Sequence, residues 1–248
     1  MLSLVLVQAG TAIEGLVPKL PDLVSSERVH ISRSAASLLG SSSLQEAQLR
    51  QSPSKEFNYL LLHRQNADGS TTLEEYRSDL SNRRVDLSDQ QQGFPSSYGF
   101  AYAWLLFLPA NQREAKFKYL GQQKIEGHET FVVAFAQDPD QVKIPCQFMS
   151  KGKPTPFFYQ GVAWVDQLTF RIVMLHTDLL RPLSDVRLTQ MTAEVFFQTA
   201  HIRGIDLDLW LPQQVLIISE RGSQRFAELH EYSNYRLYRA KTRIVPAP

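Results

Sequence analysis

Hydrophobic and polar residues alternate most regularly between Phe157 and Leu175, where two runs of β-favouring residues flank a polar break at Asp166-Gln167. Alternation with a period of two is typical of a strand that buries one face. We therefore predict a β-hairpin, and consider the case in which its loop holds an even number of residues. Small residues would then oppose large ones on one apolar face, in the pairs Val165 with Leu168, Ala163 with Phe170, Gly161 with Ile172 and Tyr159 with Met174.

The opposite face of this hairpin is mixed. It carries Gln160, Val162, Trp164, Thr169, Arg171 and Val173. A mixed face suits a sheet that is buried on one side and wetter, or covered by a ligand, on the other. The pattern leaves open which of the two faces is concave.

The N-terminal part has a helical spacing instead. A loose apolar stripe runs among Glu, Arg and Ser residues and consists of Leu20, Leu23, Val24, Ile31, Leu38 and Leu39. Asp22 follows two prolines and can cap a main helix, which Gly40 ends. A second short helix is expected around Leu44 to Arg50. We therefore predict an N-terminal helical region over residues 1–55.

Period two returns at Phe57 and continues in hairpins toward the C-terminus. A short apolar helix is expected near residues 97–108, after a polar loop from Ser88 to Ser97 whose last serines can cap it. The predicted strands are NYLLLHRQ and STTLEEYRS around a turn at Asn66–Gly69, a third strand at Arg83–Leu87, AKFKYLGQQKI and HETFVVAFA, the hairpin above, a strand from Met191, IDLDLW ended by Leu211-Pro212, and finally QVLIISE with QRFAELHEYSNYRLYRA.

These runs amount to about nine to eleven strands after a helical start. That order predicts an α+β fold, with one large, curved, mostly antiparallel sheet and with the N-terminal and inserted helices packed on one side. No segment rich in Gly, Pro and Ser divides the chain. We expect a single domain over residues 1–248, with strands over 56–240 and a tail at 241–248.

Composition narrows the class of protein. In 248 residues, 43% are hydrophobic and 21% charged, which indicates a globular chain. A formal net charge of +1 provides no long-range field for nucleic acid, so no nucleic-acid partner is expected. The single cysteine, Cys146, excludes an intramolecular disulfide and a Cys-based zinc cage.

Membrane and targeting signals are weak. No apolar run reaches the roughly 18–20 residues of a spanning helix, so no transmembrane span is expected. The first residues, MLSLVLVQAGTA, form a short apolar run without a positively charged start. They fit a weak or truncated signal, or equally a first helical turn or strand of the folded domain.

No catalytic motif stands out. Six histidines are scattered without metal-ligand spacing, and neither a GxSxG elbow nor a Gly-rich phosphate loop is present. Asp206 and Asp208 would lie on one strand face about 7 Å apart, although a solvated outer face explains them better than glycoside chemistry. Asp166 is interpreted as a turn former whose side chain bonds the following backbone. We expect a non-enzymatic protein with no cofactor and no metal.

The C-terminal half carries GVAWVDQLTFRIVML, a strand with Thr192, Glu194 and Phe196, then LDLWLPQQVLII and HEYSNYRLYR. Together with YLGQQKIEGHETFVVAFA, this pattern resembles the outer-membrane lipoprotein carrier (LolA/LolB-like) superfamily and its exported bacterial relatives, over roughly Phe57 to Arg239. The resemblance implies an incomplete β-barrel closed over by helices. It also implies an apolar cavity for a lipid or lipoprotein acyl chain, and a place in the periplasm or cell envelope.

Aromatic and apolar residues are the best candidates for a binding site. Packing in the core is the alternative for each of them. Val162 and Trp164 are expected to line a cavity together with the 98–108 segment. The candidate ligand-binding residues are Trp104, Phe107, Val162, Trp164, Val173, Phe197 and Trp210. A monomer is expected, with an acyl chain as its ligand or, if its own side chains fill the cavity, with an envelope protein as its partner.

Overall fold

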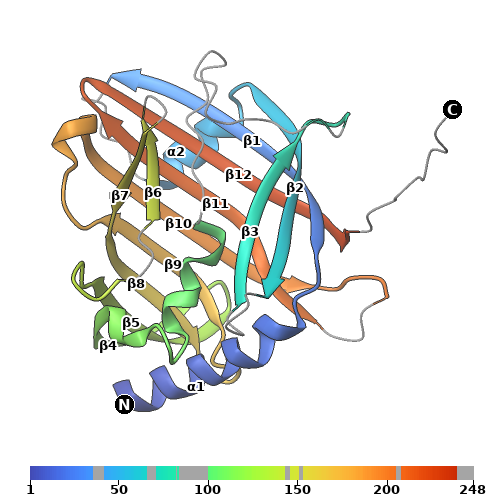
Figure 1. Ribbon diagram of the computed structural model, residues 1–248, viewed down its shortest axis with the longest axis vertical. Helices are drawn as coiled ribbons and strands as arrows, with labels where there is room; N and C mark the ends of the chain where they lie inside the picture. The colour runs from blue at the N-terminus through green and yellow to red at the C-terminus, as the bar shows by residue number, and fades with distance from the viewer. Residues whose placement is uncertain are drawn as a thin grey trace, which may run out of the picture.

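The computed structural model describes residues 1–35, 42–65, 71–81, 83, 100–142, 146–150, 153–204 and 208–238. Ten strands form one antiparallel sheet in the order β3-β2-β1-β12-β11-β10-β9-β8-β5-β4, which is open at β3 and β4 (Figure 1). The predicted fold class is confirmed. The strands are β1 Leu23–Ala35, β2 Ser54–Gln65, β3 Thr71–Ser78, β4 Ala115–Ile125, β5 His128–Gln137, β8 Tyr159–Asp166, β9 Ile172–Leu179, β10 Leu188–Ala200, β11 Leu209–Arg221 and β12 Gln224–Leu237.

Helical segments lie on both faces of this sheet. The helix α1 (Leu2–Leu16) runs along one end of the sheet, and the 3₁₀ helix η3 (Phe100–Phe107) packs on the near face in Figure 1. The helix α2 (Ser42–Leu49) lies behind the sheet. Short 3₁₀ turns are η1 Val17–Lys19, η4 Gln112–Glu114 and η5 Ser184–Val186, and a separate hairpin consists of β6 Cys146–Ser150 and β7 Lys153–Phe157. None of the helices described is long and apolar enough to cross a bilayer.

The sheet face toward α1 and η3, here called the covered face, carries the main core. On β5, β8, β9 and β10 this face is apolar, and its side chains with no exposed surface are Val133, Ala163, Val165, Leu175 and Val195, which define the apolar half. Trp104, Leu106 and Phe107 of η3 belong to the same core. Phe107 is fully buried, and its ring meets those of Phe117 and Phe135 edge-on at 5.3 and 5.8 Å.

On β1, β3 and β12 the covered face buries charges, and Glu27, Arg77, Glu228 and His230 define the charged half. Arg77 Nη2 donates to Glu27 Oε1 over 2.7 Å, and His230 Nδ1 lies 2.8 Å from the same oxygen. Burial alone would raise the pKa of Glu27, but the Arg77 charge and the His230 hydrogen bond lower it to about 2.

His230 completes this buried cluster. Its Nε2 lies 3.3 Å from Glu228 Oε2. Burial would lower the pKa of His230, but its bonds to Glu228 and Glu27 outweigh burial and raise it. Below the raised pKa of His230, two carboxylates are therefore matched by one guanidinium and one imidazolium among buried side chains.

The charged half explains a wrong prediction. The sequence predicts a helix from Asp22 toward Gly40, whereas Leu23–Ala35 is the strand β1, paired with β2 and β12. Ser25 and Glu27 point inward and are buried, so polar residues occupy core positions and hide the period of two. The N-terminal region of residues 1–55 is therefore not wholly helical, although α2 agrees with the short helix expected near Leu44.

The hairpin over Phe157–Leu175 is confirmed, but its predicted pairing is wrong. Four residues, not two, form the loop, because Asp166 Oδ1 accepts bonds from the backbone of Leu168 and Thr169, and Phe170 adopts φ 56°. Val165 therefore pairs with Ile172 and, past a bulge, Ala163 with Leu175. The role of Asp166 as a turn former is confirmed.

Gly161 shows why the true register needs glycine. It pairs with Thr177, and a Cβ at this position would lie 1.9 Å from the backbone oxygen of His176. Any side chain here would push the two strands apart.

The predicted break at Leu211-Pro212 is also wrong. β11 continues from Leu209 through Pro212 to Arg221, because Pro212 sits at a register shift opposite Phe197. The hairpins β2–β3, β4–β5 and β11–β12 match the predicted ones. The turn at Asn66–Gly69, the strand from residue 84 to 87, the loop at 88–97 with its capping serines, Asp206 and the tail at 241–248 lie outside the described residues.

Candidate functional site

An open hollow of about 510 Å³ lies over the ends of β9, β10 and β11 and is here called the aromatic hollow. Residues from α2 and from the β4–β5 turn close its sides. Its lining consists of Glu46, Glu126, His128, Val173, Phe196, Phe197, Gln198, Thr199, Trp210, Gln213 and Gln214. Its volume falls within the range of about 300–1,000 Å³ that is typical of ligand pockets.

The apolar part of the aromatic hollow is rigidly placed. Val173 and Phe197 are buried, and the half-buried indole of Trp210 donates from Nε1 to the backbone oxygen of Ile172 over 2.6 Å. The Arg171 guanidinium lies 5.6 Å from the ring centre of Trp210, within the range of a cation–π contact. The imidazole of His128 meets the same indole edge-on at 6.4 Å.

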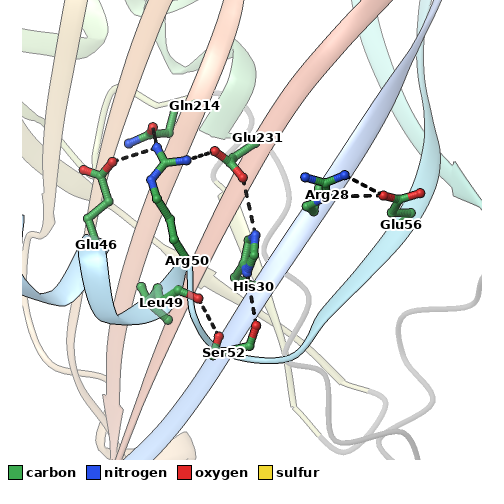
Figure 2. A network of polar contacts seen from close by, with 9 residues as sticks. All are labelled: Arg28, His30, Glu46, Leu49, Arg50, Ser52, Glu56, Gln214 and Glu231. Carbon is green, nitrogen blue, oxygen red and sulfur yellow. Dashed lines mark hydrogen bonds and ion pairs between the residues drawn. The ribbon is translucent and has the colours of Figure 1, made fainter.

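The polar rim is positioned by α2 (Figure 2). Arg50, just after α2, donates from Nη2 to Glu46 Oε1 and to Gln214 Oε1, each over 2.8 Å, and it also pairs with Glu231. Two lining residues from distant parts of the chain are therefore held by one guanidinium.

The same network ties α2 to β1 and β12. Glu231 Oε2 lies 3.4 Å from His30 Nε2, and His30 Nδ1 lies 3.3 Å from the backbone oxygen of Ser52. Below these polar contacts, Leu49 packs on Leu216 and Leu229 in a small apolar cluster on the face opposite η3. This side of the rim thus has both polar and apolar support.

The predicted site residues do not form one site. Val173, Phe197 and Trp210 line the aromatic hollow. Trp104 and Phe107 belong to the core under η3, where the rings of Trp104 and Phe197 meet edge-on at 6.4 Å. η3 therefore shares one core with Phe197 and Trp210, but its described side chains bring no residue to the lining of the hollow.

Val162 and Trp164 lie elsewhere. The core that contains Trp104 and Phe107 also contains Ala163 and Val165. Trp164, between these two residues of β8, therefore faces the other side of the sheet, and the expected cavity between Trp164 and the 98–108 segment is wrong. Trp164 Nε1 instead donates to Gln123 Oε1 over 2.9 Å. Val162 lines a separate shallow hollow with Gln160, His176 and Asp178 on the opposite face.

Titratable side chains near the aromatic hollow serve the local structure. His128 Nδ1 lies 2.9 Å from Asp166 Oδ2. Burial would raise the pKa of Asp166, but hydrogen bonds from Thr169, His128 and Leu168 outweigh it and lower the pKa. Asp208, from the predicted carboxylate pair, lies 3.1 Å from His201 at the surface. Within the described ranges, no three His, Cys, Asp or Glu side chains converge as metal ligands.

Sequence reasoning missed the polar lining. Gln198, Gln213 and Gln214 lie in or beside strands whose apolar partners were recognised, and Glu46 belongs to a helix far away in the sequence. The consecutive glutamines after Pro212 were the available signal, because a bulge directs side chains out of the regular alternation.

No protein-family model and no curated protein sequence matches the chain. Similar solved structures include a DUF1329 family protein from Desulfovibrio piger, with 15% identity, 95% of this chain and 92% of that chain covered, and a TM-score of 0.45. A putative outer membrane lipoprotein-sorting protein domain from Vibrio parahaemolyticus has 10% identity and a TM-score of 0.44, and the match covers 93% of this chain and 91% of that chain. The Mycobacterium tuberculosis lipoprotein LppX has 11% identity and a TM-score of 0.31, and the match covers 94% of this chain and 95% of that chain.

Proposed function

We propose that the protein is a non-enzymatic binding module of the bacterial cell envelope, and that it takes an apolar side chain of a protein partner into the aromatic hollow. The observation that carries this proposal is that, among the described residues, side chains of η3 occupy the space between η3 and the sheet. Phe107 is fully buried there, and Trp104 packs on Phe197. With its own aromatic rings in that space, the protein offers an apolar group the surface hollow instead.

The composition of the aromatic hollow suits a protein segment. Aromatic side chains such as Phe196 and Trp210 are typical anchor contacts in protein interfaces. Each glutamine of the rim presents both donors and an acceptor, which match the N–H and C=O groups of a partner backbone. Gln213 is exposed at this rim and is directly accessible to a partner.

An acyl chain is the second candidate for the same hollow. The observation in its favour is the apolar floor of Val173, Phe197 and Trp210. Each buried CH₂ group would contribute about 0.8 kcal/mol. The polar rim and the opening to solvent favour the protein segment, because they would leave much of a chain in contact with water.

The assignment as a non-enzymatic protein is part of the proposal. The described lining contains no Ser, Cys or Lys nucleophile. Asp166, which contacts His128, directs its other oxygen to the turn of its own hairpin. The envelope location rests on the resemblance of the C-terminal motifs.

Photo-crosslinking in living cells of the source organism tests both candidates. A photoreactive benzoylphenylalanine at Gln213 probes the rim, and the same residue at Leu168, an exposed turn position, is the control. A light-dependent protein adduct at 213 that the additional substitution Phe196→Gln abolishes would support the proposal. An adduct with the mass of a lipid would overturn the protein partner in favour of the acyl chain. Adducts no stronger at 213 than at 168 would overturn both.

A further inference from the structure

A second hollow, of about 630 Å³, lies at the opposite end of the β10–β11 hairpin and is here called the arginine hollow. The turn between β11 and β12 meets η5 there, and Gly222 N donates to Arg187 O over 3.0 Å. The lining consists of Asp185, Val186, Arg187, Arg221, Gly222, Ser223, Gln224 and Phe226.

The arginine side chains around this hollow are held in different ways. Arg221 donates from Nε to the backbone oxygen of Val186 over 3.0 Å, which fixes its guanidinium at the wall. Arg33, on the neighbouring strand β1, lies 5.5 Å from the ring centre of Phe226, a lining residue. Arg187 is exposed, and within the described part of the chain no hydrogen bond or ion pair occupies its side chain.

The charges at this place do not cancel. Arg33, Arg187 and Arg221 contribute three positive charges, and Asp185 contributes one negative charge, which leaves two positive charges. The next charges along the strands, Glu220 and Arg225, are direct cross-strand partners and offset each other. The local excess contrasts with a net charge of +1 for the entire chain.

We infer that the arginine hollow binds a phosphate group. A phosphate ester carries about −1.5 to −2 charges at pH 7 and accepts hydrogen bonds on several oxygens. Arginine forks match this geometry better than lysine, and they are the usual choice for phosphate recognition. The excess of two positive charges fits one such group. The headgroup of an anionic phospholipid and a soluble phosphate ester share this chemistry.

The test compares purified wild-type protein with Arg187→Gln and with Arg203→Gln. Arg203 is a matched control, because it is an exposed arginine at the other end of the same hairpin. Calorimetry with glycerol 3-phosphate probes the soluble ester, and co-sedimentation with phosphatidylglycerol vesicles, against phosphatidylcholine vesicles, probes the headgroup. Loss of one charge-assisted contact is expected to weaken binding about tenfold.

Weaker binding by Arg187→Gln to at least one probe, with Arg203→Gln unchanged, would support the inference. The probe that responds identifies the source of the phosphate. Equal weakening by both variants would indicate diffuse charge attraction and overturn the site. Absence of binding to either probe by the wild-type protein would overturn it as well. None of these outcomes depends on the aromatic hollow.

Discussion

The two halves of the covered face solve the same packing problem with opposite chemistry. The apolar half buries Leu175 and its neighbours among aromatic rings, whereas the charged half buries the ionisable side chains of Glu27, Arg77 and His230. Apolar burial stabilises each side chain separately and tolerates exchange of similar volumes. A buried ion network works only as a complete set, because any member left alone carries the full desolvation penalty. The two halves should therefore respond differently to substitution.

The largest effect is expected when the ion network loses its guanidinium. Arg77→Ala leaves Glu27 buried without its main partner, and removal of one partner from such a pair lowers the free energy of unfolding by about 3–5 kcal/mol. Urea unfolding measures the change. Arg28→Ala is the control, because Arg28 and Glu56 are exposed by 55% and 51% and solvent screens such pairs. Similar losses in both variants would contradict the contrast between buried and exposed pairs.

A somewhat smaller effect is expected in the apolar half. Leu175→Ala removes a fully buried side chain and should lower the free energy of unfolding by about 2–5 kcal/mol, from lost burial and from the cavity. Leu168→Ala is the matched control, because Leu168 is 91% exposed and its loss should change stability by less than about 0.5 kcal/mol. A loss below about 1 kcal/mol for Leu175→Ala would contradict a closely packed apolar half, because it would mean that neighbouring side chains move in to fill the cavity.

The double variant Glu27→Leu/Arg77→Met sharpens the comparison. It converts the ion pair into apolar packing, and such replacements are often neutral or stabilising. We expect it to be more stable than Arg77→Ala by at least about 2 kcal/mol in the same urea experiment. If the double variant is as unstable as the single one, then packing rather than charge governs this half.

The smallest effect is expected on the way that the stability of the fold changes with pH. The raised pKa of His230 means that its contribution is complete below the unfolded value of about 6.5 and is lost as the pH rises through the folded value. The lowered pKa of Glu27 acts oppositely, and its contribution is lost as the pH falls from about 4.5 through about 2. Melting temperatures between pH 6 and 9 should therefore fall more for the wild-type protein than for His230→Gln.

His176→Gln is the control for this pH experiment. His176 lies on the other face between Glu194 and Asp178, and the hydrogen bond to Glu194 raises its pKa. It is half-buried, so solvent screens its contribution. The alkaline loss of stability should persist in this variant. Equal alkaline slopes in the wild-type protein and His230→Gln would show that the buried imidazole is neutral.

The comparison also explains which parts of the fold the sequence could predict. The run from Phe131 to Phe135 in β5 has the β-branched and aromatic residues that are typical of a strand. Gly222, between β11 and β12, is the usual signal for a tight hairpin turn. The sequence did not predict the strand β1, because Ser25 and Glu27 occupy core positions and Arg77, the partner of Glu27, lies about fifty residues away. A local pattern cannot reveal a distant counterion, so a buried polar face looks like a solvated one.

The aromatic hollow was partly predictable for a similar reason. Trp210 and Phe197 lie in strands with a clear pattern, and both line it. Glu46 and Gln214 reach it through Arg50, which brings α2 next to β11. That neighbourhood depends on tertiary packing, so local periodicity could not supply it.

Quenching of single tryptophans by bromobenzene, a small mimic of an apolar side chain, tests the central claim most directly, namely that apolar side chains enter the aromatic hollow and not the core under η3. The variant Trp104→Phe/Trp164→Phe retains only Trp210, and Trp164→Phe/Trp210→Phe retains only Trp104. Bromine quenches a tryptophan that it contacts, so each variant reports one location. We predict saturable quenching of Trp210 and none of Trp104. Quenching of Trp104, or of neither tryptophan, would contradict the account.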